Sequence, residues 1–300
     1  MLQKIIILGT GGTIAGWAAD PSQPDRYQAA QLTVGRLLDA LPQDPSPFQL
    51  EAEQLAQIDS KDMDEVTWRR LLARTLHHLR DPEVRAVVIT HGTDTLEETA
   101  FLLSAVLPTD KPVILTGAMR AANSPEADGP RNLSDALVAA PDLPGGVWVV
   151  FSGQVHHASQ VQKVHPTALD PYRSASGSAA AHIDLGKVQG APTALRPEGV
   201  WPDPMQVLSS PWPRVALVLS HADAQPWWLT ALLQRGTEPP WQGLVIAGTG
   251  NATWPQCWSD ALTRLRSAGV KIWLSSRCGL GTATPALQNG LETVPWSPAQ

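Results

Sequence analysis

Short apolar runs alternate along the chain with longer amphipathic segments. Residues 5–8, 86–90 and 113–116 are almost continuously apolar, as expected for strands buried on both faces, and each run breaks into glycine and threonine. Apolar residues recur at helical spacing over 31–41 and 63–79. Strands that alternate with helices predict βα units and a parallel sheet, so the expected fold class is α/β.

Further elements extend this pattern. Residues 48–53 alternate and predict a strand, and 147–151 predict another. Gly129 and Pro130 follow Asp128, which predicts a helix that begins there, because proline is tolerated in a first turn. Asp62 and Glu65 resemble a capping box before the helix expected over 63–79.

The pattern lapses between residues 186 and 213, where prolines break any regular element. It then resumes with strands expected over 215–220, 244–247 and 270–275 and with helices over 227–233 and 255–267. We therefore expect an N-terminal α/β domain over 1–185, a Pro-rich connection over 186–213 and a smaller C-terminal α/β domain over 214–300.

Composition limits the classes of function. The 300 residues are 43% hydrophobic and 17% charged, with a formal net charge of −6, and no Lys/Arg-rich block predicts nucleic-acid binding. No apolar run approaches the ~20 residues of a membrane span. The first apolar run is interpreted as a strand of a cytoplasmic protein, and the isolated Cys257 and Cys278 fit a reducing compartment.

Hydroxyl groups follow three of the predicted strands. Thr13, Thr93 and Thr116 each come at or just after an apolar run, and Asp94 follows the second of them. Carboxyl ends of parallel strands are where ligands bind in open α/β sheets. A hydroxyl becomes a nucleophile only beside a base, and Lys163, on an expected loop, is a candidate that Asp94 can orient.

Other interpretations of these residues remain open at this point. The glycines from Gly9 resemble the start of a dinucleotide-binding loop, although Asp20 and Asp25 lie in a polar loop rather than at the end of a second strand, where a ribose-binding acid is expected. A non-catalytic module that binds amino acids would use the same polar groups. His156, His157 and a nearby third histidine lack a carboxylate or cysteine at ligand spacing, so no metal is expected.

Two long motifs narrow these alternatives. Residues 8–16 (LGTGGTIAG) and 90–100 (THGTDTLEETA) resemble the two signatures of bacterial-type L-asparaginases. Residues 116–120 (TGAMR) and 127–130 (ADGP), followed by Asn132, match that family as well. The similarity runs from Lys4 to about Ser276.

The resemblance implies a fold, an activity and a set of catalytic residues. Members hydrolyse asparagine, and often glutamine, through an acyl-enzyme intermediate, without a cofactor. By resemblance Thr13 is the nucleophile and Tyr27 is its hydrogen-bonding partner. Thr93, Asp94 and Lys163 match the family's second threonine with its aspartate and lysine.

The same resemblance implies substrate contacts and an assembly. Ser60 matches the serine that binds the substrate α-carboxylate, Asp94 also binds the α-ammonium group, and Ala118 belongs to a matching substrate-binding segment. Asn251 matches an asparagine that the C-terminal domain of a neighbouring subunit contributes. The implied partners are a small-molecule substrate and copies of the same chain, as a dimer or a dimer of dimers.

The chain also departs from the family pattern. Lys61 stands where many members have glutamine beside the carboxylate-binding serine, and Thr253 stands where some have a second asparagine. The family's inter-subunit glutamate has no clear counterpart. From the extra cation at Lys61 we expect asparagine to be preferred over glutamine, the alternative being a glutaminase-asparaginase of broader specificity.

The last residues suggest a difference at the C-terminus. Residues 297–300 (SPAQ) resemble the start of the family's closing helix, and the chain then ends. We expect the C-terminal domain to lack that helix and to expose apolar surface. That surface is expected to include four tryptophans, namely Trp254, Trp258, Trp273 and Trp296.

Overall fold

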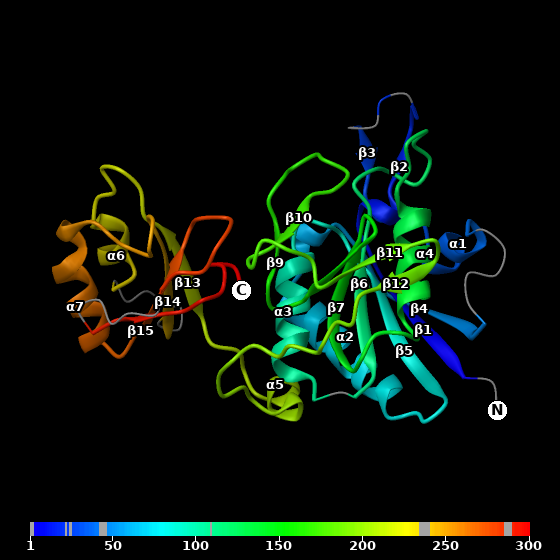
Figure 1. Ribbon diagram of the computed structural model, residues 1–300. Helices are drawn as coiled ribbons and strands as arrows, with labels where there is room; N and C mark the ends of the chain where they lie inside the picture. Colours follow the sequence, from blue (N-terminus) through cyan, green and yellow to red (C-terminus); the bar gives the residue numbers. More distant parts are fainter. Residues whose placement is uncertain are drawn as a thin grey trace. The chain divides into compact units, whose positions relative to one another are not determined.

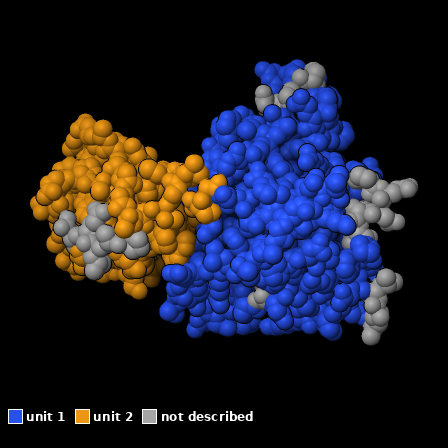
Figure 2. All heavy atoms as spheres, viewed as in Figure 1, with its two compact units in different colours: residues 1–174, 178–210 blue, residues 175–177, 211–300 orange. Residues whose placement is uncertain are grey.

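The chain divides into two compact units (Figure 2). The structure is a computed structural model that describes residues 3–21, 23, 26–41, 47–108, 110–233, 241–284 and 290–300. Unit 1 consists of residues 1–174 and 178–210, and unit 2 of residues 175–177 and 211–300. Most of the Pro-rich stretch therefore belongs to unit 1.

Unit 1 is built on an eight-stranded sheet (Figure 1). In spatial order its strands are β12 (Lys187–Gln189), β11 (Ala181–Asp184), β8 (Gln154–His157), β7 (Gly146–Phe151), β6 (Pro112–Thr116), β5 (Val84–Thr90), β1 (Lys4–Gly11) and β4 (Gln49–Ile58). The five strands from β7 to β4 are parallel, and the three beyond β7 are antiparallel. The predicted parallel sheet is thus confirmed, with an antiparallel extension that the apolar runs did not indicate.

Helices cover both faces of this sheet (Figure 1). They are α1 (Val34–Asp39), α2 (Glu65–Leu79), α3 (Leu96–Val106) and α4 (Gly129–Ala139), and the short helix α5 (Pro204–Ser209) packs against α2. Helices α1 and α4 share a buried core with alternate residues of the strands, such as Ile7, Val88 and Ile114. The residues between them in β1, β5 and β6 face the opposite side, which is why these strands have no polar face.

The connections of β1 leave in opposite directions at its carboxyl end. The chain leaves β1 through α1 to reach β4 on one side, and returns through α2 to β5 on the other side. The point at which connections leave in opposite directions is where ligands bind in open α/β sheets. Residues 12–16, after β1, and 91–95, after β5, therefore lie where a binding site is expected.

Two short hairpins stand near this edge. One pairs β2 (Trp17–Ala18) with β3 (Tyr27–Gln28), and the other pairs β9 (Val161–Lys163) with β10 (Tyr172–Ser174). Each hairpin carries a residue that the resemblance assigned to the site, namely Tyr27 and Lys163.

Unit 2 is a smaller α/β unit. Its strands β13 (Val215–Leu219), β14 (Gly243–Gly248), β15 (Lys271–Ser276) and β16 (Glu292–Thr293) form one parallel sheet in that order. Helices α6 (Trp227–Ala231) and α7 (Ser259–Ser267) accompany it, and Leu244, Ile246 and Leu265 lie in its core. The smaller C-terminal α/β domain is confirmed in fold class.

Several predicted boundaries change. Helix α1 is shorter than the helix predicted over 31–41, because Thr33 has an extended backbone and occupies the position just before the helix begins. Strand β4 runs on to Ile58, beyond the strand predicted over 48–53. It lies at the edge of the sheet, and its polar residues gave no sign of this extension. Helix α2 is capped by Asp64, which accepts the backbone N–H of Thr67, because residues 60–62 form a 3-10 turn of their own. The expected Asp62 cap is therefore wrong.

Three other expectations need correction. Lys163 lies on strand β9 and not on a loop, since β10 pairs with it. The Pro-rich stretch is not free of regular structure, because it contains β12 and helix α5, whose proline stands in its first turn. Trp258 is buried in the core of unit 2, and the other three tryptophans expected at the surface are only partly exposed.

Candidate functional site

Glycines bring four loops together at the carboxyl edge of the unit 1 sheet. A Cβ placed on Gly12 would lie 2.3 Å from Gly92 Cα, so the loops after β1 and β5 touch backbone to backbone. A Cβ on Gly92 would lie 2.6 Å from Ser60 Oγ, and one on Gly117 would lie 3.4 Å from Thr93 Cγ2. The loops that carry Thr13, Ser60, Thr93 and Ala118 therefore form one site.

Thr13 is positioned by the turn that follows β1. Gly12 has φ of +79°, which a residue with a side chain rarely adopts, and it directs the chain into a 3-10 turn, Thr13–Ala15. The Thr13 hydroxyl lies 2.8 Å from the hydroxyl of Tyr27. Thr13 is buried, with 8% of its surface exposed.

A second threonine is coupled to a lysine and an aspartate. Lys163 Nζ donates hydrogen bonds to Thr93 Oγ1 at 2.8 Å and to Asp94 Oδ1 at 2.6 Å. Thr93 is buried, whereas Asp94 is mostly exposed and presents its carboxylate to solvent. The structure thus brings Lys163 to Thr93 and Asp94, which lie 70 and 69 positions before it in the sequence.

Two residues behind this trio were not singled out from the sequence. The buried Tyr172 donates its phenolic proton to the Thr93 carbonyl oxygen at 2.7 Å, and burial raises its pKa well above the usual value. Glu97 accepts the backbone N–H of Lys163 through Oε2, and burial raises the pKa of its carboxyl to about 7. The signature itself contained Glu97, but only the tertiary structure places it against β9.

A buried histidine, His91, holds the loop after β5 that carries Thr93. His91 Nδ1 lies 2.8 Å from the Gly92 carbonyl oxygen and must donate to it, so Nε2 accepts from Thr99 Oγ1 at 2.9 Å. Trp68 Nε1 donates to the same Thr99 oxygen at 2.8 Å. Burial lowers the pKa of His91 to about 4, which keeps the ring neutral and suits this arrangement.

Ser60 and Lys61 differ in whether their polar groups already have partners. The Ser60 hydroxyl is buried against Gly92 and has no hydrogen-bond partner among the described residues. The Lys61 ammonium group pairs with Asp59 at 2.8 Å and with Asp62 at 3.1 Å. Its charge is therefore balanced within its own turn, which removes the physical basis for expecting a free cation beside Ser60.

Ala118 lies on a loop that a carboxylate organises. Asp128, at the start of α4, accepts the backbone N–H groups of Met119 at 2.9 Å and Arg120 at 2.9 Å. Asn132 Nδ2 donates to the Gly117 carbonyl oxygen at 3.0 Å. Ala118 itself is fully buried, so its side chain contributes shape rather than a polar contact.

Asn251 is the one predicted site residue in unit 2. It lies in the turn after β14, where its Oδ1 accepts the backbone N–H of Thr284 at 2.7 Å. Every other predicted site residue lies in unit 1.

The dinucleotide interpretation lacks structural support. The glycine turn leads into a three-residue 3-10 turn and not into a long helix whose N-terminus would bind a pyrophosphate. The Gly12 N–H already donates to the Ile58 carbonyl oxygen at 2.8 Å. Asp25, one of the two acids considered for ribose, lies outside the described residues.

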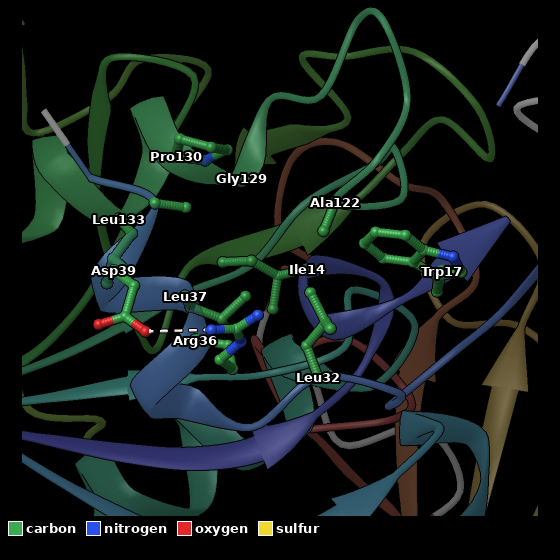
Figure 3. Close-up of a pocket in the computed structure, with 11 residues that line it drawn as sticks. Ile14, Trp17, Leu32, Arg36, Leu37, Asp39, Ala122, Gly129, Pro130 and Leu133 are labelled. Atoms are coloured by element: carbon green, nitrogen blue, oxygen red, sulfur yellow. Dashed lines mark ion pairs between the residues drawn. The ribbon is translucent and has the colours of Figure 1, made fainter.

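A pocket of about 310 Å³ lies beside the first loop (Figure 3). Ile14, Leu37 and Leu133 line it together with Trp17, and Arg36 pairs with Asp39 at 3.7 Å there. None of the predicted catalytic residues lines this pocket, and its mainly apolar wall is unsuited to a zwitterion. The hydrolytic candidate is therefore the polar loop cluster.

The described residues contain no group of three or more His, Cys, Asp or Glu that can hold a metal ion. In the same part of the chain, no helix combines the length and the apolar character that crossing a membrane requires.

Comparison with known proteins gives consistent matches. Residues 4–195 match the family model "Asparaginase, N-terminal", and residues 214–294 match "Glutaminase/Asparaginase C-terminal domain". The protein named "Probable L-asparaginase periplasmic" from Haemophilus influenzae is 33% identical over 294 residues, which is 94% of this chain and 80% of that protein. A glutaminase-asparaginase from Pseudomonas fluorescens is 31% identical, covering 93% of this chain and 77% of its own length.

A solved structure agrees with this assignment. The crystal structure of a probable cytoplasmic L-asparaginase from Campylobacter jejuni has a TM-score of 0.84 and 30% sequence identity, and the match covers 99% of this chain and 92% of that one. With both family domains present in order, and with the paired threonine loops at the carboxyl edge of the sheet, this chain belongs to the asparaginase family of enzymes.

Proposed function

We propose that this enzyme hydrolyses L-asparagine to L-aspartate and ammonia through an acyl-enzyme on Thr13. The observation that carries the proposal is that two threonine hydroxyls, each hydrogen-bonded to a second polar side chain, lie on loops that touch. We refer to each threonine with its partner as a hydroxyl system. Thr13 bonds to Tyr27 at 2.8 Å, and Thr93 bonds to Lys163 at 2.8 Å. The names of the relatives support asparagine as the substrate.

The two hydroxyl systems divide the chemistry. Thr13 Oγ attacks the side-chain amide carbon, and the C–N bond breaks as an ester forms. The hydroxyl proton leaves through Tyr27 and the Thr93–Lys163 pair, and the departing nitrogen gains it to become ammonia. A water molecule then attacks the ester, its proton returns to Thr13, and aspartate is released.

Two further groups suit a zwitterionic amino acid. The Ser60 hydroxyl can donate to the α-carboxylate, and the Asp94 carboxylate can accept from the α-ammonium group. Asp94 already holds Lys163, so substrate binding and the proton pathway share this carboxylate.

The proposal is tested by replacing the nucleophile. Thr13→Ala is expected to abolish ammonia release with little change in melting temperature, because only one hydroxyl is lost. Thr33→Ala is the matched control, since Thr33 is exposed and its side chain caps nothing. Near-wild-type turnover by Thr13→Ala would refute the assignment.

The acyl-enzyme itself needs a separate measurement. Hydroxylamine added during turnover attacks the ester and converts part of the product to the aspartyl hydroxamate. Direct attack of water on the bound amide leaves no ester to intercept, and a constant aspartate yield would then contradict the covalent mechanism.

Broader glutaminase-asparaginase activity is the second candidate, and the Pseudomonas fluorescens relative favours it. The pairing of Lys61 with Asp59 and Asp62 leaves no free cation to enforce the predicted preference for asparagine. The values of kcat/KM for asparagine and glutamine decide between the two.

A cytoplasmic location and assembly into a dimer or a dimer of dimers stay predictions.

A further inference from the structure

We propose that Glu97 is a positioning residue for the hydrolysis, because it holds the backbone of Lys163 where the lysine side chain reaches Thr93 and Asp94. The inference rests on the role proposed for Lys163 in proton transfer. It assigns to Glu97 a function beyond that of an acid in the first turn of α3.

The argument begins with the position of Lys163 in its hairpin. Lys163 is opposite Tyr172 in the antiparallel pair, and the next residue, Val164, donates its N–H to the Pro171 carbonyl oxygen at 2.8 Å. Hydrogen-bonded and non-bonded positions alternate along an antiparallel ladder. The Lys163 N–H therefore points away from β10, toward helix α3.

Glu97 supplies the acceptor that this N–H needs. Its Oε2 accepts the Lys163 N–H directly. A backbone donor at the edge of a hairpin is expensive to leave unpaired when it is shielded from water. The carboxylate thus ties β9 to the first turn of α3.

The same lysine is held at its other end by the segment that begins α3. Nζ contacts Thr93 and Asp94, which lie four and three residues before Glu97. The main chain and the ammonium group of Lys163 are therefore both anchored to residues 93–97. Because Tyr172 also bonds to the Thr93 carbonyl, the hairpin and this segment form one rigid arrangement.

The charges around Glu97 make this anchor sensitive to pH. The groups that act on it or are acted on by it are Glu98 in α3 and Lys163 and Tyr172 in the hairpin, and Asp94, before the helix, bonds to the same Lys163 and also acts on Tyr172. Burial, with a smaller contribution from Glu98, raises its pKa to about 7. Below that pH the carboxyl gains a proton and its hydrogen bond to Lys163 loses the assistance of charge.

The experiment uses the full-length enzyme with asparagine as substrate. Glu97→Ala removes the acceptor, and we expect kcat to fall by about 10- to 100-fold, because small displacements of a catalytic group have effects of this size, while KM changes less than about threefold. Glu97→Gln keeps an acceptor without charge. We expect it to lose less activity and to lose the part of the acid-side decline in kcat that is centred near pH 7 in the wild type.

Glu98→Gln is the matched control. Glu98 is the next residue, it is also partly buried, and burial raises its pKa too. Its variant should keep the wild-type kcat and the acid-side decline, which should move slightly to lower pH because the charge of Glu98 contributes to the raised pKa of Glu97. Unchanged kcat in both Glu97 variants, or identical pH profiles for the Glu97→Gln and Glu98→Gln enzymes, would overturn the inference.

A parallel Lys163→Met variant separates this inference from the proposed mechanism. If Lys163→Met retains activity, the proposed role of the lysine is wrong, and that of Glu97 with it. If Lys163→Met loses activity while Glu97→Ala and Glu97→Gln do not, only the positioning role is wrong. Should Glu97→Ala fail to fold, the pH profile of Glu97→Gln still decides.

Discussion

At the scale of single residues, almost every hydroxyl group of the proposed site has a hydrogen-bond partner. Thr13 faces Tyr27, and Thr93 faces Lys163, whose side chain also bonds to Asp94. Ser60 is the exception, because its hydroxyl is buried without a partner among the described residues. Its hydroxyl therefore keeps its hydrogen-bonding capacity, and it lies against Gly92 in the loop that precedes Thr93, where the proposed substrate can use it.

Ser60→Ala is expected to weaken substrate binding more than it slows the chemistry. A hydrogen bond to a charged group contributes about 1.5–3 kcal/mol, so KM for asparagine should rise about 10- to 100-fold while kcat changes little. Steady-state kinetics provide the measurement. Thr75→Val is the control, because Thr75 in α2 also has a buried hydroxyl without a partner among the described residues, and its kinetics should match the wild type. A proportionate fall in kcat for Ser60→Ala would instead indicate a role in the chemistry.

At the scale of secondary structure elements, the site depends on how closely the loops after β1 and β5 approach. Gly12 and Gly92 are in contact through their backbones, and each is followed directly by a threonine. A side chain at either position would separate the two hydroxyl systems. The two strands pair in parallel register from Ile5 to Gly9, so neither loop can shift alone.

Gly12→Ala is therefore expected to lose activity and stability together. The backbone conformation of Gly12, with φ of +79° and ψ of −171°, is essentially restricted to glycine and alone disfavours alanine by about 1–3 kcal/mol. The contact with Gly92 should add about 1–3 kcal/mol of overpacking, because both partners are backbone. Urea unfolding and ammonia release are the measurements.

Gly186→Ala isolates the contribution of a positive φ to that effect. Gly186 has a similar φ of +71°, and a Cβ there would meet nothing within 4 Å. This variant should lose only the conformational term and keep its activity. Equal losses of stability in the two variants would show that the contact between Gly12 and Gly92 is unimportant.

At the scale of the whole molecule, the predicted site residues divide between two units. Thr13, Tyr27, Ser60 and the Thr93 group belong to unit 1, whereas Asn251 belongs to unit 2. The resemblance to the family places Asn251 in the site of a neighbouring subunit. Complementation between two inactive chains tests this arrangement directly.

We expect Thr13→Ala and Asn251→Ala chains to restore activity when they are co-expressed. In a mixed dimer, one site combines the intact Thr13 of one chain with the intact Asn251 of the other. Random pairing should recover about a quarter of wild-type activity, since half of the dimers are mixed and one of their two sites is intact. Each variant alone serves as the control. No recovery, with both variants impaired alone, would place Asn251 in the site of its own chain.

The sequence by itself determined where the buried strands lie along the chain, that their sheet is parallel, and that threonines stand at the strand ends. The reason is local, because continuous apolar runs identify strands covered on both faces, and glycine after a strand identifies a turn at the carboxyl edge. The resemblance named Thr13, Thr93, Asp94 and Lys163. These assignments did not require knowledge of how the elements pack.

Only the tertiary structure decided what holds these residues in place. Glu97 reads as an ordinary helical acid until the β9–β10 hairpin, more than 60 residues later, places the Lys163 amide against it. Lys61 reads as an extra cation until Asp59 and Asp62 pair with it. Hydrogen bonding and charge pairing depend on distances of a few ångströms between atoms from separate elements, and no local pattern along the chain encodes those distances.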